Sequence, residues 1–405
     1  MTSLQKMTLP LMVSLFATAC ATMPADMDVA SLHDRILTLD THIDIPLTYM
    51  AEVNPGGMTE LQVDLPKLRQ GKLDSGFWIV YTPQGELNYS GIKAAQEISE
   101  TRLKAICDMT KAFPSVGLAK TADDVRRLVD EGRHAVLIGM ENAYPLGLSG
   151  IEEELKIYTG VGVRYVGITH FGHNQFGDSS NPHPVRDNGR PRWNGLSPDG
   201  YQLVSILNRA GVMVDVSHAA KSTMMQAADA STTPIIASHS GVKAVADSAR
   251  NLDDEQLRKI AEVNGVAQMV ALGAYVKAAT PEQKAARDAL DAEFGSNQAL
   301  WGTYKKDRYD ARRKTITAMA PEATVADFVD HIDHAVAVAG IDHVGIASDF
   351  DGGGGIIGWK DASETQNVTA ELVARGYSED EIEKIWGGNL LRVMEAVEAG
   401  AMVSG

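Results

Sequence analysis

Short apolar runs rich in β-branched residues recur along this chain, and longer segments with helical periodicity separate them. That alternation is typical of β-α units built around a parallel sheet. Unbroken apolar runs are expected where both faces of a strand are covered. The sequence therefore predicts an α/β fold, a (β/α)8 TIM-type barrel, with strands at residues 35–40, 76–81, 135–139, 165–169, 212–216, 234–237, 266–270 and 344–347.

The helical segments carry their own start signals. Thr121 with Asp124, and Ser378 with Glu381, form capping patterns at the beginning of two predicted helices. Residues 281–321 are charged, helical in pattern and longer than one crossover requires, so we expect a helical insertion before the last strand. A lid over the barrel and a peripheral decoration are both open interpretations of this insertion.

The N-terminal segment has the pattern of a targeting signal. An apolar run at residues 9–19 ends in small residues before Cys20, which resembles a secretory signal with a bacterial lipoprotein cleavage site. The run is shorter than the roughly 20 residues that a membrane-crossing helix needs. We expect a signal peptide over residues 1–20, a linker over 21–30 and a single barrel domain over 31–405, exported to the periplasmic side and held to a membrane by lipid on Cys20. An ordinary signal peptide cut near Cys20 is the alternative.

The charge of the chain excludes one class of partner. Lys and Arg number 37 against 53 Asp and Glu, which gives a formal net charge of −16. Such a chain lacks the broad basic surface that binding to a phosphate backbone requires. We therefore expect no nucleic-acid partner.

Side chains that can bind metals or move protons follow almost every predicted strand. In a β/α barrel the carboxyl ends of the strands converge on one mouth, where active sites are built. Each residue alone is weak evidence, but their joint placement predicts one site. The residues are His42 and Asp44 after the first strand, Glu141 after the third, His170 after the fourth, His218 after the fifth, His239 after the sixth and Asp349 after the eighth.

The tripeptide His-Ile-Asp occurs twice, and its surroundings separate the two copies. His42 and Asp44 stand at i and i+2 beside a strand, where both side chains point to the same face. His331 and Asp333 stand in a helical stretch, where positions i and i+2 diverge by about 200°. We expect metal binding from the first copy only, and we expect His331 and His334 to be exposed helix residues.

Three imidazoles and two carboxylates are too many ligands for one catalytic ion that keeps an open position. Two ions bridged by a carboxylate would use all five residues. Such a pair, about 3.5 to 4 Å apart, can activate a water near neutral pH. Neutral imidazole suits borderline metals such as zinc. A closed metal site that only braces the barrel is the alternative.

Ten sequence blocks carry a resemblance to a known family. The blocks are DTHIDIP, VDLPKLRQGKLDSGFWIVY, GMENA, GVRYVGITH, LSPDG, MVDVSHAAKS, PIIASHS, SARNLDDEQL, HVGIASDFDG and GGNLLRV. In this order they resemble the membrane (renal) dipeptidase family of zinc hydrolases, over nearly the whole chain after the leader. The resemblance implies a (β/α)8 barrel with two Zn²⁺ ions per chain. It also implies hydrolysis of dipeptides, including those with a C-terminal D-residue.

The resemblance further implies a ligand set. His42 and Asp44 would bind one zinc ion, His218 and His239 would bind the other, and Glu141 would bridge the two.

Four other residues would handle the substrate. By the same resemblance, His170 would contact the substrate carbonyl or the developing oxyanion, and Asp349 would move protons near the bridging water. Arg250 would clamp the free carboxylate, a task that suits a planar guanidinium; a surface ion pair at a helix start is the alternative for this residue. Tyr275 would contact the substrate, although the residues around it (MVALGAYVK) depart from the family pattern, as does FGHNQFGDSS after His170.

We therefore expect an exported zinc dipeptidase that attacks the peptide carbonyl with a metal-bridging hydroxide. The rival enzyme is another barrel metallohydrolase that acts on an ester, lactone, β-lactam or N-acyl amino acid. A barrel kept only as a binding module is the third interpretation. The expected partners are a small dipeptide and a membrane reached only through an N-terminal lipid, with a homodimer left open.

Overall fold

The computed structural model describes residues 28–184, 186–294 and 303–404, and its strands form one parallel sheet. Most of the strand residues are buried, in agreement with their unbroken apolar sequences. The strands are β1 Leu39–Ile43, β2 Ser75–Tyr81, β3 Val116–Leu118, β4 His134–Glu141, β5 Val163–Gly167, β6 Met213–Asp215, β7 Ile236–Ser240, β8 Val266–Val270 and β9 Val344–Ala347.

Eight of these strands follow one another around a barrel in the order β1-β2-β4-β5-β6-β7-β8-β9, and β3 pairs with β4 outside this path. The first and last strands meet just beyond their ends. There Ile43 forms a parallel bridge with Phe350, and the N–H of Asp44 donates to the carbonyl of Phe350 at 2.9 Å. Because the strands are parallel, their carboxyl ends open at one mouth.

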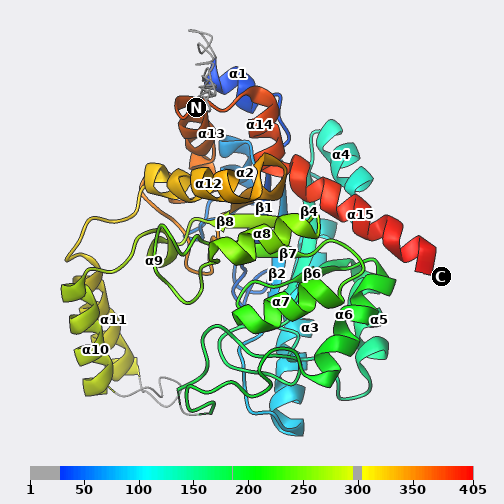
Figure 1. The fold of residues 1–405 in the computed structure, drawn as a ribbon. Coiled ribbons are helices and arrows are strands. Elements are labelled where there is room, and N and C mark those ends of the chain that lie inside the picture. The colour runs from blue at the N-terminus through cyan, green and yellow to red at the C-terminus, as the bar shows by residue number, and fades with distance from the viewer. Residues whose placement is uncertain (1–27, 185, 295–302, 405) are drawn as a thin grey trace, which may run out of the picture.

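Helices surround the barrel (Figure 1). The predicted caps are confirmed: the Thr121 side chain accepts from the N–H of Asp124, and Ser378 forms a capping box with Glu381. The α-helices are α1 Val29–His33, α2 Leu65–Gly71, α3 Tyr89–Ala112, α4 Ala122–Asp130, α5 Ile151–Val161, α6 Pro198–Ala210, α7 Lys221–Ala230, α8 Asp254–Glu262, α9 Gly273–Val276, α10 Pro281–Phe294, α11 Thr303–Thr317, α12 Val325–Ala339, α13 Gln366–Ala374, α14 Glu379–Glu383 and α15 Asn389–Ser404. Short 3-10 helices lie at η2 Ile341–His343 and η3 Ala362–Glu364, and a π-helix at η4 Lys384–Gly388.

Alternate residues of the strands belong to two different apolar clusters. Phe77 and Ile79 of β2 pack in a cluster that also contains residues of α15, whereas Trp78 and Val80 belong to the larger cluster shared with the surrounding helices. Both faces of the strand are therefore covered. This packing fixes the side of the barrel to which each residue points, and so positions the side chains at the mouth.

The structure confirms the barrel and corrects its first strand. The predicted strand at residues 35–40 instead lies at Leu39–Ile43, because the chain turns after α1, where the N–H groups of Arg35 and Ile36 both donate to the carbonyl of Leu32. His42 consequently lies inside β1 rather than after it. Strand β3 was not predicted.

The predicted helical insertion is present as α10 and α11, which stand beside the barrel (Figure 1). The two helices have a small core of their own, formed by Leu290, Phe294, Tyr309 and Ile316. They are thus an addition that packs separately from the barrel core.

The predicted signal peptide, Cys20 and most of the linker lie outside the described residues. None of the helices in the described ranges is long and apolar enough to cross a membrane.

Candidate metal centre

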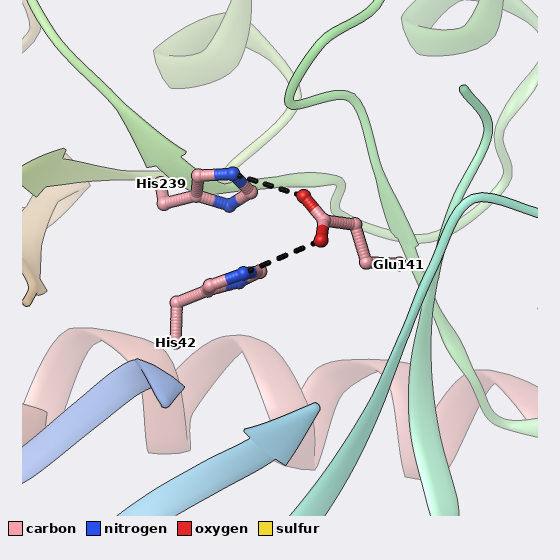
Figure 2. A group of neighbouring side chains, drawn as sticks. All are labelled: His42, Glu141 and His239. Atoms are coloured by element: carbon pink, nitrogen blue, oxygen red, sulfur yellow. Dashed lines mark ion pairs between the residues drawn. The ribbon is translucent and has the colours of Figure 1, made fainter. Parts of the chain in front are cut away.

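Glu141, the last residue of β4, lies at the centre of the mouth. Its Oε1 atom is 3.1 Å from Nε2 of His218, 3.3 Å from Nε2 of His239 and 3.7 Å from Nε2 of His170. Its Oε2 atom is 3.7 Å from Nε2 of His42. Figure 2 shows the carboxylate reaching between two of these imidazoles, with one oxygen toward each. A carboxylate in this position can bridge two ions.

A second group of ligand atoms surrounds His42. Its Nε2 atom lies 3.4 Å from Oδ2 of Asp44 and 3.9 Å from Oδ1 of Asp349. The same Nε2 atom is buried and has no hydrogen-bond partner among the described residues. A buried polar atom without a partner is costly. A cation between these side chains would remove that cost.

The strand pairing is irregular beside His42 in β1 and beside His239 in β7. The register between β1 and β2 shifts between Asp40 and Ile43, on either side of His42, and the register between β7 and β8 shifts between Ala237 and Ser240, on either side of His239. Such irregularities redirect side chains next to functional sites.

Two other site residues lie at strained turns. His218, after β6, and Asp349, after β9, have positive φ angles of 65° and 58°. Non-glycine residues rarely adopt this conformation, which costs on the order of 1 kcal/mol or more. Both residues line the cavity at the mouth.

Contacts behind the site set the tautomers of two imidazoles. The Tyr165 hydroxyl donates to the carbonyl of Thr41 at 3.2 Å and lies 3.0 Å from Nδ1 of His42, so this Nδ1 carries the proton and donates to Tyr165. When the ring is neutral, the His42 Nε2 lone pair therefore faces the site.

His239 is held in the same way. The Ser238 hydroxyl donates to Oδ2 of Asp215 at 2.8 Å and lies 2.9 Å from Nδ1 of His239. The His239 Nε2 lone pair therefore also faces the site.

Burial and charge set the protonation of the ligands. Burial lowers the pKa values of His218 and His239 well below the ordinary value, which keeps both imidazoles neutral. Burial opposes the charge of His42 too, but Glu141 and Asp44 outweigh it and raise the His42 pKa well above the ordinary value. This position therefore favours a positive charge, which a proton or a metal ion can supply.

Asp349 is a carboxyl suited to carrying a proton. Burial is the first cause that raises its pKa well above the ordinary value, and repulsion from Asp44 and Glu141 adds to it. A protonated carboxyl beside a nucleophile is a candidate general acid.

A cavity of about 420 Å³ opens above these residues, a size that suits a small ligand. Besides the candidate metal ligands, its wall includes Tyr81, Arg102, His170, Phe171, Leu272 and Tyr275.

Arg250 lies behind this wall. Its side chain is buried, its Nη1 donates to Ser240 Oγ at 2.8 Å and its Nη2 donates to the carbonyl of His239 at 2.6 Å. Its Nε has no partner among the described residues, and its guanidinium lies 5.6 Å from the centre of the Tyr275 ring. The surface ion pair considered as the alternative for Arg250 is therefore wrong.

The second His-Ile-Asp copy lies in α12, away from the site, as predicted. His331 is nevertheless buried, which corrects the expectation of an exposed residue. It belongs to the inner face of α12 with Phe328 and Ala335, and its ring nitrogens lie 2.8 Å from the N–H of Val242 and 2.9 Å from the carbonyl of Val276. His334 is partly exposed and pairs with Asp254 at 2.8 Å.

Several residues of the site were not predicted. Tyr165 reads as an ordinary core aromatic within a strand, and Arg102 lies in the long helix α3, far in sequence from any candidate ligand. Tyr81, as the last residue of β2, occupies the type of position that the strand-end argument singles out. The position of Tyr81 at a strand end is therefore a sequence signal for this residue, provided that aromatic residues are considered along with metal ligands.

Comparisons with known proteins identify the family of this chain. The family described as "Membrane dipeptidase (Peptidase family M19)" matches residues 27–404. The chain belongs to this family. It is a metallopeptidase of the dipeptidase type, and the resemblance found in the sequence is confirmed.

Individual relatives cover most of the chain. Dipeptidase tcpJ of Claviceps purpurea is 31% identical over 342 residues, which are 83% of this chain and 69% of that protein. The crystal structure of the "probable dipeptidase PvdM" of Pseudomonas aeruginosa is 36% identical, with a TM-score of 0.84, and covers 92% of this chain and 98% of that one. A dipeptidase "AC" of family M19 is 25% identical, with a TM-score of 0.70 over 89% of this chain and 98% of that one.

Proposed function

We propose that this dipeptidase uses two zinc ions held at the barrel mouth and hydrolyses free dipeptides, including those with a C-terminal D-residue. His42 and Asp44 would hold one ion, and His218 and His239 the other, with Glu141 between them. The observation that carries this proposal is the arrangement around Glu141, whose Oε2 faces His42 and whose Oε1 faces the other two imidazoles.

The residues present fit such a pair of ions. The buried Nε2 of His42 has no hydrogen-bond partner among the described residues, and it stands among carboxylates that favour a positive charge. Neutral imidazoles and carboxylates are the ligands that zinc takes in catalytic sites. When bound, two such ions supply an activated water and polarise the peptide carbonyl.

The remaining side chains would handle protons and charge. Burial lowers the pKa of His170, so it is neutral and can donate Nε2–H to the carbonyl oxygen as negative charge grows there. Asp349, whose raised pKa favours the protonated form, would deliver its proton to the leaving amine. Tyr275 would form part of the wall beside the substrate.

Arg250 would fix the free carboxylate of the substrate. Among the described residues it forms no ion pair, and it lies against Tyr275, which lines the cavity. A buried guanidinium without a counter-charge favours an anionic ligand.

The test is an assay of the purified zinc-loaded protein with L,L- and L,D-dipeptides, their C-terminal amides, esters and a β-lactam. The proposal expects hydrolysis of both types of free dipeptide and weak activity on the amides. Hydrolysis of the ester or the β-lactam without hydrolysis of the free dipeptides would favour the rival hydrolase. Stable binding without turnover of any compound would favour the binding module.

We also propose that the chain is exported and held to a membrane by lipid on Cys20. This rests on the apolar run and small residues before Cys20. Replacement Cys20→Ala should release the protein from the membrane fraction or leave it unprocessed. Recovery of the wild-type protein free of membranes, with an unmodified N-terminus beyond Cys20, would exclude the anchor.

A further inference from the structure

Arg102 is a second arginine at the site, and unlike Arg250 it lines the cavity directly. It projects from α3, the helix that follows β2. Its Nε donates to the carbonyl of Ile45 at 3.2 Å, and its Nη1 donates to the carbonyl of Tyr81 at 2.9 Å. Its guanidinium also lies 5.3 Å from the centre of the Tyr81 ring. These contacts hold the group in one orientation.

Arg102 forms no ion pair within the described parts of the chain, and the carboxylates of Asp44 and Glu141 act on its charge only from beyond ion-pair distance. Its hydrogen bonds go to neutral carbonyls only, and no described carboxylate forms an ion pair with it. Its remaining nitrogen, Nη2, has no protein partner and is not sealed from solvent. The side chain is partly buried, so an unpaired charge is costly here. An anionic group of a ligand would offset that cost.

The two arginines lie on opposite sides of the mouth. Arg102 is bonded to the ends of β1 and β2, whereas Arg250 is bonded to β7. In the ring of eight strands, β2 and β7 are half a turn apart. A dipeptide whose α-carboxylate is directed toward Arg250 therefore directs its N-terminal residue toward Arg102.

We infer that Arg102 binds a carboxylate on the side chain of the N-terminal residue, so that the enzyme prefers dipeptides beginning with an acidic residue. This inference rests on the proposed function, because it takes the α-carboxylate to lie on the Arg250 side. A guanidinium held by two carbonyls and an aromatic ring is well ordered for such a charge-assisted hydrogen bond. The positive charge of bound metal ions would offset the nearby Asp44 and Glu141 carboxylates and leave Arg102 free to attract the substrate.

The experiment compares kcat/KM for L-Glu-L-Ala with that for the isosteric L-Gln-L-Ala, using the zinc-loaded full chain. The wild type should favour Glu-Ala by about tenfold or more, as a charge-assisted hydrogen bond implies. Reversed dipeptides, Ala-Glu and Ala-Gln, should show a ratio near one. Arg102→Gln should bring the Glu-Ala to Gln-Ala ratio close to one, and Arg102→Lys should retain part of the preference.

A matched control is Arg164→Gln. Arg164 is also partly buried and also donates to backbone carbonyls, those of Lys120, Thr159 and Val163, but it lies in β5 near the opposite end of the barrel. This variant should keep the wild-type ratio.

Three outcomes would overturn the inference. One is a wild-type Glu-Ala to Gln-Ala ratio of one or less, which needs no variant to be measured. Another is a ratio that Arg102→Gln or Arg102→Lys leaves unchanged. The third is a wild-type preference for Ala-Glu over Ala-Gln, which would assign Arg102 to the side chain of the C-terminal residue. Hydrolysis of Ala-Ala in the same assay separates these outcomes from failure of the proposed function, in which no dipeptide would be cleaved.

Discussion

The Nε2 atoms of His218 and His239 lie 3.0 Å apart at the barrel mouth. The His239 atom carries a lone pair, because its Nδ1 donates to Ser238. Burial keeps both rings neutral. Two imidazoles converging in this way, beside one oxygen of Glu141, form a pair of ligands with the chemistry that zinc favours.

Tyr165→Phe should weaken metal binding without removing a ligand. The hydroxyl fixes the tautomer of His42 through Nδ1, and loss of such an outer contact typically costs about 10- to 100-fold in metal affinity. The measurement is the zinc dissociation constant. Tyr158→Phe is the control, since the Tyr158 hydroxyl is buried against Ser99 away from the mouth. Equal affinities for the wild type and Tyr165→Phe would show that this contact does not tune the site.

Arg250→Ala should reduce turnover of free dipeptides far more than that of C-terminally amidated ones. Loss of one partner from a buried charged pair costs about 2 to 5 kcal/mol, equivalent to a loss of about 30-fold to several thousand-fold in kcat/KM. Arg250→Lys should restore only part of the rate, because lysine lacks the planar fork. If both substrate types lost activity equally, Arg250 would have a structural role only.

His331→Ala should destabilise the fold and leave the metal content unchanged. The imidazole bonds two buried backbone groups, and leaving them without partners costs about 1 to 3 kcal/mol. His334→Ala removes a partly exposed ion pair, so its effect should stay within about 0.5 kcal/mol. Urea unfolding and elemental analysis of both variants check this. A lost metal ion in His331→Ala would contradict the assignment of the two His-Ile-Asp copies.

His134 should make the stability of the fold depend on pH. Burial lowers its pKa from 6.5 to about 4, and its neutral ring lies 2.8 Å from the carbonyl of Leu73 and accepts from the Trp78 indole. The unfolded chain thus binds the proton more readily. The stabilising effect is complete above pH 6.5 and is lost as pH falls toward 4, by an amount on the order of 3 kcal/mol.

The comparison is between wild type and His134→Gln, unfolded in urea at several pH values. The difference in unfolding free energy should shrink as the pH falls from 6.5 to 4. A difference that is constant over this range would mean that His134 keeps an ordinary pKa in the fold.

Much of the fold could be predicted because buried parallel strands have a plain sequence pattern. Six of the eight predicted runs match a barrel strand to within two residues at each end, and the run 234–237 overlaps β7 only at residues 236–237. The first run is displaced because residues 35–38 belong to the turn after α1 and the segment that leads into β1. Strand β3 has only the residues Val116–Leu118. So short a segment offers no periodicity to detect.

The candidate ligands could be predicted because the barrel brings the strand ends together whatever the exact strand boundaries. Residues that reach the site from positions other than strand ends could not be predicted. Arg102 reaches the cavity from a helix, and Tyr165 supports His42 from within the barrel core, so both depend on tertiary packing. The burial of His331 was not predicted, because the sequence of α12 does not show that the backbone groups of Val242 and Val276 lie within hydrogen-bond reach of its ring.

A zinc titration of the chelated protein tests directly whether hydrolysis requires two zinc ions per chain. Metal content and hydrolysis of a free dipeptide are measured at each addition, for the wild type and for Asp44→Ala. Without metal we expect no hydrolysis, and wild-type activity should rise until two zinc ions are bound per chain, whereas Asp44→Ala should retain about one ion and little activity. Full activity of the wild type without metal, or with a single ion per chain, would contradict this expectation.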